Sequence, residues 1–342
     1  MTRGAGGIHN AAMNWSRRDF LKTTAAAVPG LLAWNLPASV SPRPLKFGVC
    51  ADVHQDIMHD GEARLRRFID MAKQDQLEFI LQLGDFCRPY ERNRPFLAIW
   101  EEFARPRYHT LGNHDNDGGF KWPQVMEFWK MPQRYYSFDQ DGWHFVVLDG
   151  NEIKPAKRAA GYPRYIGAEQ QAWLRADLQK SGAPTLIFSH QSLEDPEGVE
   201  NGAEIRSLLE QANQTAGWRK VGACFSGHHH IDYAVQLGGI HYVQVNSMSY
   251  QWLGEKFPHV RYGAEADKSH PSMKYTAPYK EALFATFALA AEGIRITGRR
   301  SEYEGPSPWE LGYPEVKGTA RDKARMVPWI SDRQLKCQTR PG

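Results

Sequence analysis

The feature that most constrains the fold is an alternation, from Pro44 onward, of short apolar runs with longer amphipathic stretches. Short apolar runs predict strands and amphipathic stretches predict helices, so their alternation predicts an α/β layered arrangement. The expected strands are 45–50, 78–83, 107–111, 143–148, 184–189, 221–226, 233–237 and 240–245. The expected helices are 63–74, 96–104, 168–180 and 204–214.

The later part of the chain departs from this alternation. The segment 254–278 is polar and interrupted by glycine and proline, which predicts a long loop or insertion. Segments 282–290 and 293–297 then predict a closing pair of strands. From Ser301 the chain is rich in proline, glycine and charge, which predicts a tail over the surface. We therefore expect one domain over 42–300 and a tail over 301–342.

Composition excludes two broad classes of protein. The 342 residues are 42% hydrophobic and 24% charged, which indicates a folded globular chain rather than a disordered one. The net charge of +3 is mild and both signs are interspersed, so no nucleic-acid-binding surface is indicated. The four cysteines are widely spaced and predict buried or idle thiols, not a disulfide framework or a zinc ribbon.

The first forty residues predict an export signal. Arg17 and Arg18 precede Phe-Leu-Lys and then an apolar stretch from Thr23 to Trp34, a pattern that closely resembles the twin-arginine signal. The stretch is too short to span a bilayer, which takes about 20 residues, so we expect no stable membrane span. We expect residues 1–41 to be this signal, the twin-arginine translocase to be a partner during export, and the mature protein to be periplasmic or secreted.

Residues with metal-binding side chains follow the expected strands directly. They form the groups Asp52-Val53-His54, Gly84-Asp85, Gly112-Asn113-His114-Asp115, Ser189-His190 and Gly227-His228-His229-His230. Taken singly, each group is more often a turn or a helix cap than a ligand set. Because open α/β sheets build sites where strands end, five such loops predict one shared pocket.

Taken together and in this order, the groups resemble the calcineurin-like metallophosphoesterase family, whose pattern is D-x-H, G-D, G-N-H-D/E, H and G-H-x-H. The resemblance covers Asp52 to His230, a little over half of the chain. It implies a β-sandwich flanked by helices and a site for two divalent metal ions. Mixed oxygen and imidazole ligands suit manganese, iron or zinc.

The resemblance also assigns roles to single residues. It gives Asp52, His54 and His230 to one metal ion, gives Asn113, His190 and His228 to the other, and makes Asp85 the carboxylate that bridges both. Two cations neutralise an anionic phosphate ester and activate a water molecule, while the bridging carboxylate relieves their mutual repulsion. By the same resemblance His114 is the general acid for the leaving oxygen, and Asp115 orients its imidazole.

Other polar residues near these groups have simpler interpretations. On an extended backbone His229 points away from its two neighbours, so we do not expect it to be a metal ligand. His109, His144 and His241 lie in apolar strands and are expected to be structural. Asp56, His59 and Asp60 could touch the substrate, but a solvated loop is the expectation for them. Asp149 is a candidate to support the site or to form a turn, and the stretch 246–250 is a candidate to line the pocket.

The residue three positions beyond Asp85 bears on the metal chemistry. Purple acid phosphatases have a metal-binding tyrosine there, whereas this chain has Arg88, and a guanidinium offers no lone pair to a metal. Serine/threonine phosphatases continue into Asp-Arg-Gly, which is also absent here. We therefore predict a site without tyrosinate.

The predicted function is an exported, dinuclear, metal-dependent phosphoesterase for small-molecule phosphate esters, with phosphodiesters favoured. A phosphomonoesterase or nucleotidase shares the same metal motifs and stays open as an alternative. A non-catalytic binding protein on this scaffold would be expected to lack ligands, and none is missing. A metallo-β-lactamase-like hydrolase would require an H-x-H-x-D-H cluster, which the sequence does not contain.

Overall fold

A computed structural model describes residues 42–155 and 161–337. The predicted export signal lies outside these residues. The described residues form two six-stranded sheets, ordered β14-β13-β12-β1-β2-β3 and β4-β5-β6-β7-β9-β8, and a two-stranded ribbon. The strands of the first sheet are β1 Leu45–Cys50, β2 Phe79–Gln82, β3 Arg107–His109, β12 Ala285–Ala290, β13 Gly293–Thr297 and β14 Arg333–Leu335. Those of the second are β4 Tyr136–Gln140, β5 Trp143–Val147, β6 Thr185–Phe188, β7 Val221–Ser226, β8 Tyr233–Leu237 and β9 Ile240–Gln244.

The two sheets pack face to face because alternate side chains of their central strands are large and apolar. Phe47 of β1 stacks on Phe79 of β2 with ring centroids 4.5 Å apart and meets Phe145 of β5 edge-on at 5.8 Å. All three side chains belong to the central core between the sheets. Neighbours in the chain, such as Ile80 and Val146, point to the outer faces instead, as the two-residue period of a strand requires.

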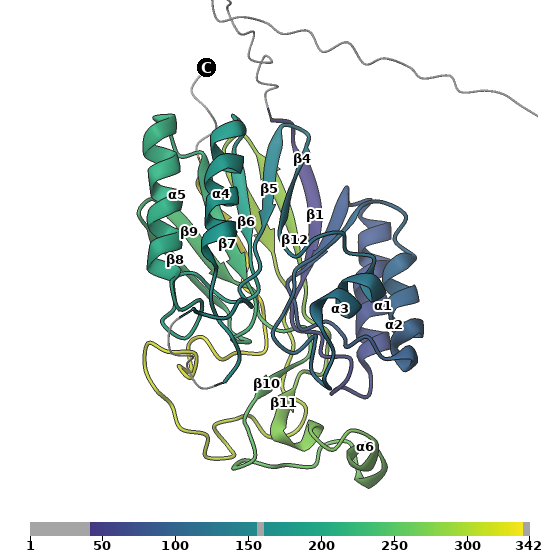
Figure 1. The fold of residues 1–342 in the computed structure, drawn as a ribbon. Coiled ribbons are helices and arrows are strands. Elements are labelled where there is room, and N and C mark those ends of the chain that lie inside the picture. Colours follow the sequence, from purple (N-terminus) through teal and green to yellow (C-terminus); the bar gives the residue numbers. More distant parts are fainter. Residues whose placement is uncertain (1–41, 156–160, 338–342) are drawn as a thin grey trace, which may run out of the picture. The chain divides into compact units, whose positions relative to one another are not determined.

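Helices cover both outer faces of this sandwich (Figure 1). The first sheet is covered by α1 Gly61–Gln74, α2 Arg94–Glu101 and α3 Trp122–Trp129, and the second by α4 Ala168–Lys180 and α5 Gly202–Ala216. In α1 the buried residues Leu65, Phe68, Ile69 and Ala72 recur at the spacing of one helix face. The fold is therefore the α/β layered β-sandwich flanked by helices that the sequence predicts.

Parallel pairing decides where the loops meet. β1, β2 and β3 run parallel to one another, as do β5, β6, β7 and β9. The carboxyl ends of parallel strands lie at one edge of a sheet, so the loops after β1, β2, β3, β6 and β7 emerge at a shared end of the sandwich. These five loops carry all the predicted ligands.

The segment 254–278 is more ordered than the long loop predicted for it. It contains α6 Ala264–Ser269 and the 3-10 turn η3 Met273–Tyr275, and it ends in β11 Thr276–Pro278, which pairs with β10 Tyr250–Trp252. The tail also differs from the prediction, because β14 extends the first sheet and buries Leu335. Among the described residues, no helix has the length and apolar character needed to cross a membrane.

Candidate metal centre

The loops that carry the predicted ligands have unusual backbone geometry. Eight described non-glycine residues have a positive φ, and five of them are predicted metal ligands: Asp52, His54, Asp85, His228 and His230, with φ from 51° to 70°. Only a few per cent of non-glycine residues adopt this region, and Asp and His are among those that tolerate it. Such concentrated strain is typical of functional sites.

The first group of ligands joins the loops after β1 and β7. Candidate ligand atoms of Asp52, His54 and His230 all lie within 4.8 Å of one another. His230 Nε2 is 3.2 Å from Asp52 Oδ1 and 3.1 Å from His54 Nε2. All three residues are buried. The structure thus brings together the three residues that the resemblance gives to one metal ion.

The second group joins the loops after β2, β3, β6 and β7. Candidate ligand atoms of Asp85, His190 and His228 also lie within 4.8 Å of one another. His190 Nε2 is 3.0 Å from Asn113 Oδ1 and 3.2 Å from His228 Nδ1. Asn113 thereby lies with the pair to which the sequence assigned it.

Asp85 connects the two groups through one oxygen atom. Its Oδ2 is 3.6 Å from His54 Nε2 in the first group and 3.3 Å from His190 Nε2 in the second. Its Oδ1 accepts a hydrogen bond of 2.8 Å from the backbone N–H of His114. Oδ2 is thus the oxygen positioned to bridge two cations.

Hydrogen bonds to backbone carbonyls set the tautomers of two of these histidines. Nδ1 of His190 donates to Leu83 O and Nδ1 of His230 donates to Tyr250 O, each at 2.8 Å. Because Nδ1 carries the proton, Nε2 of a neutral ring presents its lone pair to the site. Lone pairs and carboxylate oxygens that converge in this way repel one another unless a cation lies between them. The residues present therefore fit a pair of divalent metal ions.

Burial and charge act together at the site. Burial, partly opposed by Asp85, lowers the pKa of His54 well below its ordinary value, so this imidazole is neutral. Burial also lowers the pKa of His190, but the charges of Asp85 and Asp52 outweigh it and raise the pKa to about 9. The same negative charge attracts a divalent cation, which displaces the proton when it binds.

Two glycines let the ligand loops approach closely. Gly84 has a φ of +95°, and a Cβ there would lie 2.5 Å from His190 Nδ1. A Cβ on Gly227 would lie 2.4 Å from Asp52 Oδ2. Both contacts are shorter than any real side chain permits, so each motif requires glycine for reasons of space.

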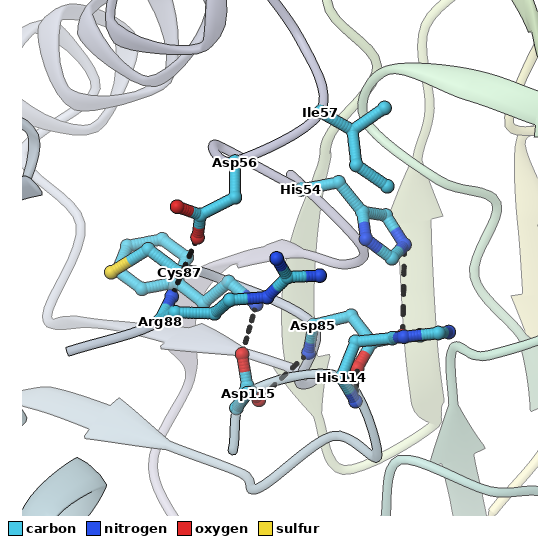
Figure 2. Close-up of a pocket in the computed structure, with 9 residues that line it drawn as sticks. His54, Asp56, Ile57, Asp85, Cys87, Arg88, His114 and Asp115 are labelled. Carbon is cyan, nitrogen blue, oxygen red and sulfur yellow. Dashed lines mark hydrogen bonds and ion pairs between the residues drawn. The ribbon is translucent and has the colours of Figure 1, made fainter. Parts of the chain in front are cut away.

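The environment of His114 corrects one prediction from the sequence. His114 Nδ1 is 2.7 Å from Asp117 Oδ2 and 3.0 Å from the hydroxyl of Tyr162. Asp115, expected to orient this ring, instead accepts hydrogen bonds from the backbone N–H groups of Asp85, Phe86 and Gly112. Figure 2 shows the carboxylate of Asp115 directed at that backbone. The prediction for Asp115 is wrong because the turn after Asn113 directs its side chain into the protein.

The hydrogen bonds of His114 also affect its charge. Burial acts to lower the pKa of this ring, but the charge of Asp85 and the hydrogen bond with Asp117 outweigh burial and raise it. A raised pKa favours the protonated ring, which is the form that a general acid needs. Asp117 and Tyr162 were not among the sequence candidates. The one available signal was the spacing His-x-x-Asp within a turn, which is weak because Asp is common in turns.

Arg88 lies in the pocket rather than on an unrelated surface. It lines a small pocket with His54, Asp85 and His114, and Figure 2 shows its guanidinium directed at the space between the two histidines. Its Nη2 is 3.2 Å from Asp117 Oδ2.

Asp56 accepts a hydrogen bond of 2.8 Å from the backbone N–H of Arg88, and its side chain is only 5% exposed. The expectation of a solvated Asp56 is therefore wrong.

The remaining candidates, Asp149 and the stretch 246–250, are buried. Ser247 and Ser249 are fully buried, and their hydroxyls donate to the backbone oxygens of Asp52 and Val53, so they brace the first ligand loop. Asp149 is buried against Arg134 and accepts hydrogen bonds from Asn151.

His109 and His144 are buried and have the structural roles predicted for them. His109 contacts Gln82, and His144 lies between Asp139 and Asp177. His229 belongs to neither ligand group, as predicted, and its Nδ1 contacts Gln244.

Comparisons with known proteins agree with this geometry. A family model for calcineurin-like phosphoesterases matches residues 45–232, which include every predicted ligand. The chain is similar to a dimetal phosphatase from Danio rerio, at 18% identity and a TM-score of 0.56 over 75% of this chain and 96% of that one. It is also similar to GAP50, the anchor in the inner membrane complex of Plasmodium, at 15% identity and a TM-score of 0.52 over 86% of this chain and 89% of that one. The comparison with curated proteins gives no match.

Proposed function

The chain belongs to the calcineurin-like phosphoesterase family of metal-dependent hydrolases, and from this premise we propose that it hydrolyses phosphodiesters at a dinuclear metal centre. The observation that carries the proposal is the position of Asp85 Oδ2, within 3.6 Å of a ligand nitrogen in each group. Asp52, His54 and His230 would hold one cation, Asn113, His190 and His228 would hold the other, and Asp85 would be shared by both. When bound, the cations supply positive charge for the phosphate and activate a water molecule as the nucleophile.

The other pocket residues act on the substrate directly. His114 protonates the leaving oxygen from Nε2, the ring nitrogen that Asp117 and Tyr162 leave available. Asp117 holds the ring through Nδ1 and is therefore a positioning residue. Arg88 donates hydrogen bonds to a non-bridging phosphate oxygen, because its guanidinium is the permanent cation among the residues that line this pocket.

The charges near the cations favour a diester over a monoester. A phosphodiester carries one negative charge at neutral pH, whereas a monoester carries close to two. Arg88 already forms an ion pair with Asp117, and Asp56 adds another carboxylate to the pocket lining. A lining with so little surplus positive charge suits the less charged ester.

A substrate screen tests this preference. Purified protein, reconstituted with manganese, zinc or iron, is assayed on bis-p-nitrophenyl phosphate, p-nitrophenyl phosphate, nucleotides and cyclic nucleotides. We expect kcat/KM to be highest on a diester. A higher value on p-nitrophenyl phosphate or a nucleoside monophosphate would support the phosphomonoesterase or nucleotidase alternative.

The metal pair is proposed to be manganese, iron or zinc without a tyrosinate ligand, since Arg88 stands at the position of the purple acid phosphatase tyrosine. Tyr250 is the tyrosine to test, because its ring lies 5.0 Å from those of His54 and His230. An iron-loaded preparation is expected to lack an intense visible charge-transfer band. Such a band, lost in Tyr250→Phe, would overturn this part of the proposal.

Export by the twin-arginine route is the part of the proposal that rests on the sequence alone. Folding before export fits a metalloenzyme, because the cytoplasm can load the metal ions first. Replacement of Arg17 and Arg18 by lysine keeps the charge and is expected to leave precursor in the cytoplasm of a bacterium that has this pathway. Equal periplasmic yields of both forms, measured by cell fractionation, would rule the route out.

A further inference from the structure

A third group of metal-binding side chains lies beside the dinuclear centre. It comprises Asp195 and Glu197, from the loop after His190, and His229, between the ligands His228 and His230. Candidate ligand atoms of these three residues all lie within 4.8 Å of one another. The function proposed above uses none of the three.

The hydrogen bonding of His229 shows which ring nitrogen is free. Nδ1 lies 2.9 Å from Gln244 Oε1, and Gln244 Nε2 donates to Glu194 Oε1 at 2.7 Å. The carboxylate of Glu194 can only accept, so the amide of Gln244 is oriented with its oxygen toward His229. Nδ1 therefore donates to Gln244, and Nε2 is the ring nitrogen that can bind a metal ion. Among the described residues this Nε2 atom is buried without a hydrogen-bond partner.

Hydrogen bonds to the backbone fix the loop that carries both carboxylates. Arg164 donates to the carbonyl oxygens of Glu197 and Gly198, the latter at 2.7 Å, and so fixes the path of the loop. Asp195 Oδ1 accepts the backbone N–H of Glu197 at 2.8 Å, and Oδ2 has no hydrogen-bond partner within residues 42–155 and 161–337. A ring nitrogen of His229 lies within 4.8 Å of an oxygen of each carboxylate, so a cation held there would offset the repulsion between the two anionic groups.

We propose that His229, Asp195 and Glu197 bind a third divalent transition-metal ion, separate from the dinuclear pair. One imidazole nitrogen and two carboxylates form a ligand set of the kind that zinc or manganese takes, whereas calcium and magnesium prefer oxygen ligands alone. The relay from Glu194 through Gln244 to Nδ1 is the outer support that metal-binding histidines commonly have. The ion ties the loop after His190 to the loop that carries His228 and His230.

Zinc counting tests the site without an activity assay. The full chain is stripped with a chelator, dialysed against Zn²⁺, and its bound zinc is measured by mass spectrometry. The test variants are His229→Gln and the double variant Asp195→Asn, Glu197→Gln. The double variant Glu255→Gln, Glu265→Gln removes the same charge from exposed residues elsewhere and is the matched control.

Both test variants are expected to bind one zinc ion fewer than the wild type, and the control the same number. The test compares the zinc content of each variant with that of the wild type. If the dinuclear assignment is wrong, the total zinc content is lower in every form, but the difference between the wild type and the test variants stays the same. Zinc should also raise the Tm of the wild type more than that of the test variants, because the ion links two loops. Equal zinc content in all forms would overturn the proposal.

Crystals of the wild type soaked in Zn²⁺ give an independent measurement that does not depend on the folding of a variant. We expect an anomalous difference peak about 2.1 Å from His229 Nε2, the usual zinc–nitrogen distance. Peaks confined to the dinuclear centre would refute the third site while leaving the proposed function untouched.

Discussion

His114 Nδ1 lies 2.7 Å from Asp117 Oδ2, three residues further along the same turn. This contact predicts that Asp117→Asn keeps its metal ions but loses about 10- to 100-fold in kcat, because the ring is held less well for proton transfer. The loss should be smaller for a p-nitrophenyl ester than for an alkyl ester, since a good leaving group needs less protonation. Steady-state kinetics on both esters and metal analysis check this. A purely structural role for Asp117 would give equal losses on the two esters.

Replacing the general acid itself should have a larger effect with the same signature. His114→Ala is expected to retain both metal ions and to lose ~10²- to 10⁴-fold in turnover on poor leaving groups. Combined with Asp117→Asn, it should show little additional loss, because the two residues act as a unit. Additive losses in the double variant would contradict the pairing.

Asp85 is expected to be the most sensitive ligand. Asp85→Asn should remove nearly all activity and at least one metal equivalent, because the bridging carboxylate offsets the repulsion between the two cations. Metal analysis alongside turnover on bis-p-nitrophenyl phosphate checks this. Two bound metal ions with near-normal turnover would refute the two-metal assignment.

Arg88 should act on the substrate phosphate rather than on metal binding. Loss of a charge-assisted hydrogen bond, worth about 1.5–3 kcal/mol, predicts that Arg88→Met lowers kcat/KM by roughly 10- to 100-fold with unchanged metal content. Arg88→Lys keeps the charge and should recover part of the loss. If Arg88 merely stabilises the loop, both variants will lower the Tm and leave kcat/KM close to that of the wild type.

His144 predicts a pH-dependent stability that is independent of the metals. Burial acts to lower its pKa, but hydrogen bonds with Asp177 and Asp139 outweigh burial and raise it. The protonated His144 ring therefore stabilises the fold fully below its pKa of about 6.5 in the unfolded chain. This stabilisation is lost as the pH rises through the higher pKa of His144 in the folded chain. His144→Gln should lose about 1–3 kcal/mol at pH 5 and less at pH 9, seen as a Tm difference that narrows with pH. His241→Gln, the same change in the same sheet, is measured alongside as the matched control.

Sequence patterns predicted the regular elements well where an apolar run is buried on both faces or a helix is long. The bounds of β1, β7 and α4 agree with the prediction residue for residue. The pattern missed β4, whose residues Tyr136–Gln140 are polar at an edge, and β14, which is three residues long. Such edge strands form because a neighbouring strand offers hydrogen bonds, and that tertiary cause leaves no periodicity in the sequence.

The ligand groups were predictable because each follows a strand, and parallel pairing brings strand ends together without further information. The partner of His114 was not, since it depends on the conformation of one turn. Asp115 and Asp117 both lie close to His114 in the sequence. Only the direction of their side chains decides that Asp115 binds the loop backbone and Asp117 binds the ring of His114. Tyr162 comes from a segment 48 residues away, so no local pattern could connect it to His114.

Five predicted ligands have a left-handed backbone, so the conformation that places them at the metal centre also opposes the folding of their loops. Strained residues of this kind each oppose folding by about 1–3 kcal/mol, and the buried strands beneath them must hold the turns in place. These positions are locally frustrated in an otherwise consistent sequence. A relative of this chain that no longer bound metal would be free to relax these loops and become more stable. Efforts to stabilise the enzyme through its ligand turns would, for the same reason, select against the metal centre.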